Sequence, residues 1–254
     1  SLSLLPVACG SAVKNVGIAP LVDLVINALP SPVERGPVTG KKPGKDEAET
    51  RMPEESAPFS ALVFKTIADP YAGRLTLFRV FSGTVTSDST FYNSSRKITE
   101  RFGNGFFLEG KSQKPVESLV PGDIAAVAKL KETSTGDTIC NEKAAIIFEK
   151  VVPPPPIMSF AVAPKSRGDE DKIVSSINRI IEEDPPLTFR REEQTKEMIL
   201  SGMGQVHIEV SIEKMKRKFG VELTLKTPKV PYKETIKGKT NVQGKYKKQS
   251  GGRG

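Results

Sequence analysis

The chain has 254 residues, of which 37% are hydrophobic and 27% are charged, so it can bury a core and is long enough for two ordinary domains. No apolar run approaches the ~18 residues of a membrane span. Two cysteines and one histidine are too few for a disulfide scaffold or a histidine-rich metal site. The chain opens on Ser1 without a signal peptide pattern, so we expect a piece of a longer cytoplasmic protein.

The net charge of +8 is concentrated at the C-terminal end. Residues 229–254 contain eight basic residues and one acidic residue, so this segment carries +7 and the rest of the chain only +1. A polycation of this kind binds phosphate backbones by releasing their counterions, although a solvated, flexible end explains the same composition. The candidate RNA contacts are Lys245, Lys247, Lys248 and Arg253.

Residues 1–30 predict one strand and one helix. Residues 4–8 are mostly apolar and precede a Gly-Ser turn, whereas the leucines and valine at positions 21, 24, 25 and 29 recur at helical spacing and stop at Pro30. Because a lone strand and helix cannot bury their apolar faces, we expect this segment to be the last unit of a larger α/β domain. Residues 31–57 mix proline, glycine and charge without a period, which predicts a linker.

Residues 58–149 predict an all-β domain. Short runs rich in Val, Ile, Thr and Phe alternate with turn residues, and no helical period intervenes. A small closed barrel would remove the exposed edges of such strands. The expected strands cover residues 60–67, 74–81, 84–92, 124–130 and 144–148.

A proline-rich stretch over residues 151–156 predicts a domain boundary. After it, residues 157–228 predict the order β-α-β-β-α-β of a ferredoxin-like unit. Ser166 and Asp169 have the spacing of a capping box before the first helix, and a Pro-Pro pair after Asp184 ends that helix. The apolar residues Ile208, Ile212, Met215 and Phe219 fit one helix face, but residues 206–212 also alternate like a strand, so periodicity alone leaves this element open. Its basic last turn and Gly220 favour a helix.

No set of residues in the sequence predicts a catalytic or metal site. The segment from Gly40 to Asp46 superficially resembles a phosphate-binding loop, but it has three residues between its glycines rather than four. It also places an aspartate where Ser or Thr should bind magnesium. We therefore expect no cofactor in this chain.

Several segments, taken in order, resemble the elongation factor G family of bacterial translation. They span nearly the whole chain except residues 31–57 and 93–115. The segments are CGSAVKNVG (9–17), ADPYAGRL (68–75), FRVFSG (78–83), EDP (183–185), GMGQVHI (202–208), MKR (215–217), YKETI (232–236) and KKQSGGRG (247–254).

This resemblance implies a domain assignment. Residues 1–30 are similar to the end of a GTPase domain, where the Ser11-Ala12 pair resembles the motif whose backbone N–H reads the guanine. Residues 58–149 are similar to the second, barrel domain, and residues 157–228 to the third. Residues 229–254 are similar to the start of a fourth domain.

The resemblance also implies a function for the intact parent. It would be a monomeric GTPase that uses GTP and Mg²⁺, binds ribosomal RNA and proteins, and couples GTP hydrolysis to movement of the tRNA–mRNA complex through its fourth domain. This chain lacks the phosphate loop and switch motifs, so the piece itself is not expected to be catalytic. We also expect no contact with a membrane. In the family, Asp184 and His207 correspond to an interface that borders the pocket for the drug fusidic acid.

Two alternatives remain at this point. A release-factor-like or ribosome-protection GTPase shares the barrel and the third domain. A free-standing RNA-binding β-barrel protein would explain the basic end without any GTPase, but would leave the unit at residues 1–30 unexplained.

The basic end gives a prediction about RNA binding. Deleting residues 237–254 should weaken RNA binding and flatten its dependence on salt, because fewer counterions are released on binding. Filter binding across a salt series measures both quantities. An unchanged slope would assign the contact to the body of the chain instead.

Overall fold

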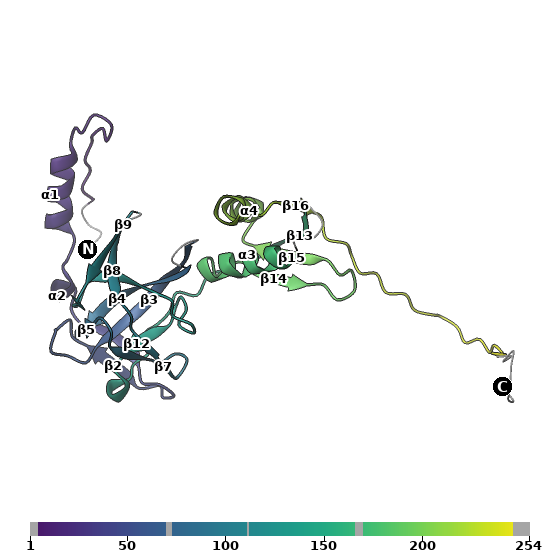
Figure 1. Ribbon diagram of the computed structural model, residues 1–254, viewed down its shortest axis with the longest axis horizontal. Coiled ribbons are helices and arrows are strands. Elements are labelled where there is room, and N and C mark those ends of the chain that lie inside the picture. The colour runs from purple at the N-terminus through teal and green to yellow at the C-terminus, as the bar shows by residue number, and fades with distance from the viewer. Residues whose placement is uncertain (1–4, 70–72, 111, 166–169, 246–254) are drawn as a thin grey trace.

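The computed structural model describes residues 5–69, 73–110, 112–165 and 170–245. Two folded bodies follow one another along its long axis, and the C-terminal segment runs away from the second (Figure 1). The first body is built from β-strands and the second from two helices on a sheet. The expected fold class is therefore confirmed: a β-barrel precedes a ferredoxin-like βαββαβ unit.

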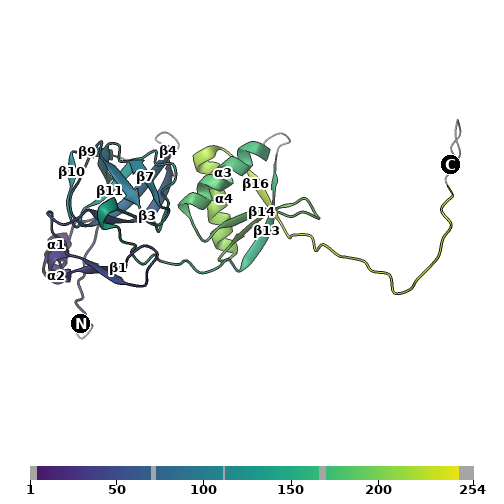
Figure 2. The same cartoon turned by 90° about the horizontal axis from the view of Figure 1, so that it is seen from below.

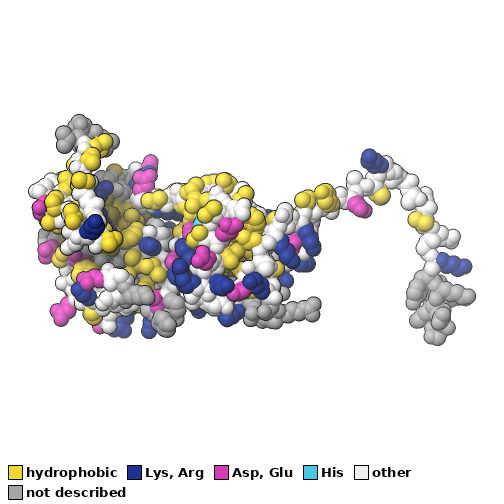
Figure 3. Space-filling view, turned by 90° about the horizontal axis from the view of Figure 1, so that it is seen from above, with side chains coloured by type: hydrophobic (Ala, Val, Ile, Leu, Met, Phe, Trp, Pro, Cys, Tyr) yellow, Lys and Arg dark blue, Asp and Glu magenta, His cyan; other side chains and the backbone are white. Residues whose placement is uncertain are grey.

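The N-terminal segment contains the expected helix but not the expected strand. Helix α1 (Ile18–Ala28) ends before Pro30 as predicted. The strand expected over residues 4–8 is wrong over the described residues 5–8, which are irregular and exposed. A strand needs a neighbour for its backbone hydrogen bonds, and the described part of the chain offers none there. Apolar side chains of α1 face solvent (Figure 3), among them Leu21, Val22, Val25 and Ile26.

The segment expected to be a linker, residues 31–57, contains regular structure. Helix α2 (Pro32–Arg35) starts with a capping box in which Ser31 and Glu34 exchange hydrogen bonds. Strands β1 (Val38–Lys41) and β2 (Ala48–Arg51) then form a hairpin. Lys41 pairs with Ile147 through two backbone hydrogen bonds of 2.8 Å, so the hairpin is fastened to the barrel. The segment predicted to be a linker therefore contains ordered elements that contact the barrel.

The barrel is one curled antiparallel sheet and one smaller pair of strands. The large sheet has the order β7-β6-β12-β3-β4-β11-β8-β9, and β5 pairs with β10. One apolar core fills it, and the rings of Phe78 and Phe102 meet edge to face at 5.6 Å inside. The strands are β3 (Ser60–Asp69), β4 (Gly73–Ser82), β5 (Val85–Thr86), β6 (Thr90–Asn93), β7 (Ile98–Arg101), β8 (Gly105–Glu109), β9 (Ser112–Val116), β10 (Ser118–Leu119), β11 (Ile124–Ala128) and β12 (Thr138–Cys140).

Three of the five expected barrel strands lie where predicted, and two do not. The expected strand 84–92 is two short strands, β5 and β6, separated by a turn. The expected strand 144–148 is irregular after a short 3₁₀ turn (Glu142–Ala144). Isolated hydrogen bonds, such as the one from the Phe148 N–H to the Thr138 hydroxyl oxygen, hold it in place instead of a strand ladder. Strands β7 to β10 and β12 gave no sequence signal, because they are short, and because β9 is exposed on both faces whereas β12 is buried throughout. These strands form because a neighbouring strand offers an edge to pair with, and not because their residues alternate between apolar and polar.

The third domain has the predicted order. Its sheet runs β14-β15-β13-β16, all antiparallel, with both helices on one face. The open question at residues 206–212 is settled as a helix, because Ile208 and Met215 are buried while Val206 is exposed. The capping box expected at Ser166 and Asp169 lies outside the described residues. The elements are β13 (Met158–Pro164), α3 (Glu170–Glu183), β14 (Thr188–Arg191), β15 (Met198–Gly202), α4 (Gln205–Phe219) and β16 (Leu223–Lys226).

The two bodies lie side by side, with the helical face of the third domain toward the barrel (Figure 2). Helix α3 lies against β3 of the barrel. The chain that joins them, residues 151–157, has no regular structure, and Val151 and Ile157 are almost fully exposed. The joint itself therefore contributes little packing.

After β16, residues 227–245 have no regular secondary structure, and most of their side chains are exposed. One hydrogen bond fastens the beginning of this segment, from the Lys229 N–H to a Glu197 carboxylate oxygen at 3.0 Å. Among the described helices, none combines the length and apolar composition needed to cross a membrane.

The turn after β4 gives a prediction about stability. Gly83 has φ of +67°, and a Cβ there would overlap Ala57 O and the Phe59 backbone. Gly44 has φ of +74° with open space around it. Gly44→Ala should cost only the left-handed backbone term of about 1–2 kcal/mol, and Gly83→Ala clearly more. Urea unfolding followed by barrel amide signals measures the difference; equal costs would contradict the close approach.

Candidate functional site

The C-terminal end of α3 carries three consecutive carboxylates, on Glu182, Glu183 and Asp184. The negative end of a helix dipole disfavours negative charge, typically by ~0.3–1 kcal/mol per group, so such a cluster needs positive or hydrogen-bonding partners. Each of the three carboxylates has such a partner, and each partner is a different residue. The cluster is therefore paired and partly buried.

Asp184 and His207, the two interface candidates from the sequence, contact each other. His207 Nε2 lies 3.1 Å from Asp184 Oδ2, and both side chains are mostly buried. The Met203 N–H donates to His207 Nδ1 at 3.1 Å. Because a backbone N–H can only donate, Nδ1 must accept, and the ring proton therefore sits on Nε2 and points at the aspartate.

Local sequence fixes both partners. The Asp184 N–H closes the last turn of α3 on Ile180 O, and the Leu187 N–H returns to Asp184 O across the Pro-Pro pair. His207 lies in the first turn of α4, directly after the Gly-Met-Gly segment. A Cβ on Gly202 would come within 2.9 Å of His207 Nδ1. The absence of a side chain at Gly202 is thus what lets the imidazole seat against the strand.

The other two carboxylates, of Glu183 and Glu182, contact Lys218 of α4 and Arg74 of the barrel. Lys218, in the last turn of α4, donates to both oxygens of Glu183 at 2.8 Å and to Ala68 O of β3 at 3.3 Å. Arg74 of β4 places its Nε 3.8 Å from a Glu182 oxygen. The sequence identifies Lys218 only as a helix-end charge, and no sequence signal relates it to Ala68, which lies 150 positions away.

Arg74 is held rigidly on the barrel. Its two terminal nitrogens donate to Lys131 O, Thr133 O and Ser134 Oγ at 2.5–3.0 Å. The same loop is held from its other side by Glu100, whose carboxylate accepts backbone N–H groups of residues 131–133 and the Thr133 hydroxyl. Burial tends to raise the pKa of Glu100, but these hydrogen bonds outweigh it and hold the pKa below its usual value.

The guanine candidates Ser11 and Ala12 lie at a tight turn before α1. The Ser11 N–H donates to Val16 O at 2.9 Å, and Val16 returns a hydrogen bond to Ser11 O. A Cβ on Gly10 or Gly17 would collide with backbone across this turn. The Ser11 N–H is engaged, whereas the N–H of the exposed Ala12, like that of Val13, has no hydrogen bond within the described turn.

The candidate RNA contacts lie at the end of the extended segment. Lys245 is exposed there, whereas Lys247, Lys248 and Arg253 lie outside the described residues. The described end of this segment lies far from helices α3 and α4 (Figure 1).

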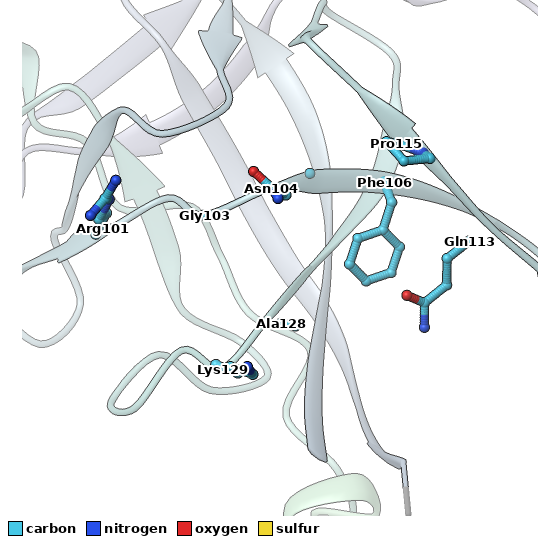
Figure 4. Close-up of a pocket in the computed structure, with 9 residues that line it drawn as sticks. Arg101, Gly103, Asn104, Phe106, Gln113, Pro115, Ala128 and Lys129 are labelled. Atoms are coloured by element: carbon cyan, nitrogen blue, oxygen red, sulfur yellow. The ribbon is translucent and has the colours of Figure 1, made fainter. Parts of the chain in front are cut away.

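A separate cavity of about 530 Å³ lies on the barrel between β8, β9 and the end of β11. Arg101 and Lys129 lie at one end, and the Phe106 ring and the Gln113 amide at the other (Figure 4). Arg101 is already paired with Asp88 at 3.1 Å, so its charge is partly neutralised. The cavity could receive an anionic group, with Lys129 as its cation.

Among the described residues, no group of three or more His, Cys, Asp or Glu side chains is placed to hold a metal ion. Cys9 is exposed and Cys140 is buried, and both are free thiols. Burial raises the pKa of the Cys140 thiol, which keeps it protonated and unreactive.

Comparison with known proteins decides the family. The model for elongation factor G domain 2 matches residues 58–142, and the model for elongation factor G domain III matches residues 153–227. The chain belongs to the elongation factor G family. Elongation factor G of Thermotoga maritima is 45% identical over 249 residues, and that of Thermotoga neapolitana is 44% identical over the same length.

The match takes in 98% of this chain but only 36% of the Thermotoga maritima elongation factor G. A crystal structure of a Thermus thermophilus protein superimposes with a TM-score of 0.67 at 28% identity, covering 86% of this chain and 30% of that one. The paired carboxylates of α3 lie inside the region matched by the domain III model, and Ala68 and Arg74 inside that matched by the domain 2 model.

The geometry around His207 predicts its tautomer. The neutral ring should carry its proton on Nε2, because Nδ1 accepts from Met203. A long-range ¹H–¹⁵N correlation spectrum reads the tautomer directly, and the signal is unambiguous because the chain has a single histidine. Asp184→Asn should leave Nε2 protonated. A spectrum with protonated Nδ1 would contradict the arrangement.

Proposed function

We propose that this chain is the central part of a ribosome-dependent translational GTPase of the elongation factor G type. In this role the barrel and the third domain transmit the effect of GTP hydrolysis to a further domain that moves the tRNA–mRNA complex. The observation that carries the proposal is the order of the two bodies, each matching the corresponding elongation factor G domain model. The chain itself does no chemistry.

The N-terminal unit supports this proposal. Helix α1 exposes apolar side chains along its length, which a preceding domain would cover. Within the described turn the Ala12 N–H is left for a guanine oxygen, as expected of the end of a GTPase domain. GTP and Mg²⁺ would therefore belong to the intact parent, with this chain contributing one backbone contact.

The partners follow from the same family. Ribosomal RNA and proteins would contact the assembled factor in the cytoplasm, where it would act as a monomer, and the basic segment after β16 would lead toward the RNA. Asp184 and His207 would lie at the interface with the GTPase domain, on the side where fusidic acid binds in this family. Their hydrogen bond fixes the shape of that surface.

The test uses the full-length parent with ribosomes, measuring GTP hydrolysis and mRNA movement in a single round. We expect ribosomes to stimulate hydrolysis strongly and the mRNA to advance. Hydrolysis without movement would support a release-factor-like, recycling or ribosome-protection role, and no stimulation would overturn the proposal. His207→Ala in the same parent should change fusidic acid sensitivity if the pair borders the drug pocket.

The chain alone is the control. A single backbone contact contributes about 1 kcal/mol, far below the ~8 kcal/mol of a micromolar ligand, so calorimetry should show no micromolar GTP binding. Micromolar binding would mean that the phosphates are held by residues of this chain, against the assignment of its N-terminal unit.

A further inference from the structure

We propose that Arg74 and Lys218 are positioning residues that form a two-point polar latch between the barrel and the third domain. The latch joins both residues to the carboxylates at the end of α3 and sets the orientation of the third domain on the barrel. It is a property of this chain alone, so it can be tested without ribosomes.

The covalent joint cannot set this orientation by itself. Residues 151–157 have no regular structure, and Val151, Val152 and Ile157 are 91%, 76% and 82% exposed. Consecutive prolines keep such a segment extended, but an extended spacer without packing leaves the angles at its two ends free. The relative placement of the two bodies must therefore come from contacts across their interface.

Lys218 is the first of the two points. An ammonium has three donors, and here two bond to Glu183 in the third domain and one to Ala68 O in the barrel. The Lys218 side chain is 21% exposed and that of Glu183 13%. A pair so sheltered is screened by salt less than a surface pair, and a displaced barrel would leave one donor unpaired.

Arg74 is the second point, and it is prepared for its partner. The loop at residues 131–134 fixes the ends of its guanidinium, while Glu100 fixes that loop. Its remaining Nε–H is buried and has no hydrogen-bond partner within the described chain, and the Glu182 carboxylate lies 3.8 Å away. A shift of about one ångström would complete this hydrogen bond, so the second point is engaged electrostatically and can tighten.

Three of the segments that carry the family resemblance meet at this place. Ala68 and Arg74 belong to the segment at residues 68–75, and Glu183 to the one at residues 183–185. His207, which pairs with Asp184, belongs to the segment at residues 202–208. The latch therefore shares a helix end with the Asp184–His207 pair. A ligand or domain that displaces that pair would disturb the end of α3 on which both latch points depend.

The experiment measures the distance between the two bodies in the whole chain by double electron–electron resonance. Spin labels are placed through Ser118→Cys on the barrel and Gln194→Cys on the third domain, both at exposed positions. Cys9 is replaced by serine, and the buried Cys140 stays unlabelled. The latched chain should give one narrow distance distribution.

Lys218→Met and Glu182→Gln are the test variants. Each should broaden the distribution and remove its single maximum. Glu182→Gln is the safer of the two for folding, because its side chain is 47% exposed and its ion pair within the described chain is with Arg74. Circular dichroism and amide spectra confirm that each variant is folded.

Lys216→Met and Glu192→Gln are the matched controls, since they remove ion pairs that lie wholly inside the third domain, with Glu222 and Arg190. They should leave the distribution narrow. If the test variants give the same distribution as the controls, or if the chain without these substitutions already gives a broad distribution, the latch is overturned. Neither result would bear on ribosome-dependent activity, which the single-round assay decides separately.

Discussion

The negative end of helix α3 constrains the rest of the molecule. Three carboxylates stand where the helix dipole is least favourable to them, and the chain supplies Arg74, Lys218 and His207 to compensate. These partners come from a barrel strand, the end of α4 and the start of α4. One electrostatic requirement thus fixes how the two helices of the third domain meet and where the barrel lies against them.

The rigid parts and the adjustable parts of the molecule are separated accordingly. Each body has its own apolar core, so each can keep its shape when the other moves. Polar contacts join the two bodies, and one of them, between Arg74 and Glu182, is not yet a hydrogen bond. Polar contacts of this kind reorganise at low cost compared with a shared core, as the proposed function requires.

Much of the architecture could be predicted from local patterns. The barrel strands β3, β4 and β11 and all six elements of the third domain carried clear alternation, helical spacing or turn residues. The short strands β7 to β9, the hairpin β1–β2 and the bend at residues 144–148 could not be found this way. The strands are only four or five residues long, and the bend depends on the Lys41–Ile147 pair, whose two partners are far apart in sequence.

The candidate site, like the fold, was predictable from the sequence only in part. The sequence alone determined that Asp184 ends a helix, that His207 begins one, and that the basic residues gather at the C-terminal end. Only the tertiary structure decided that the aspartate and histidine touch, and that Lys218 and Arg74 bridge the two bodies. The reason is physical: periodicity reports which face of an element is buried, whereas an ion pair depends on where two whole elements pack.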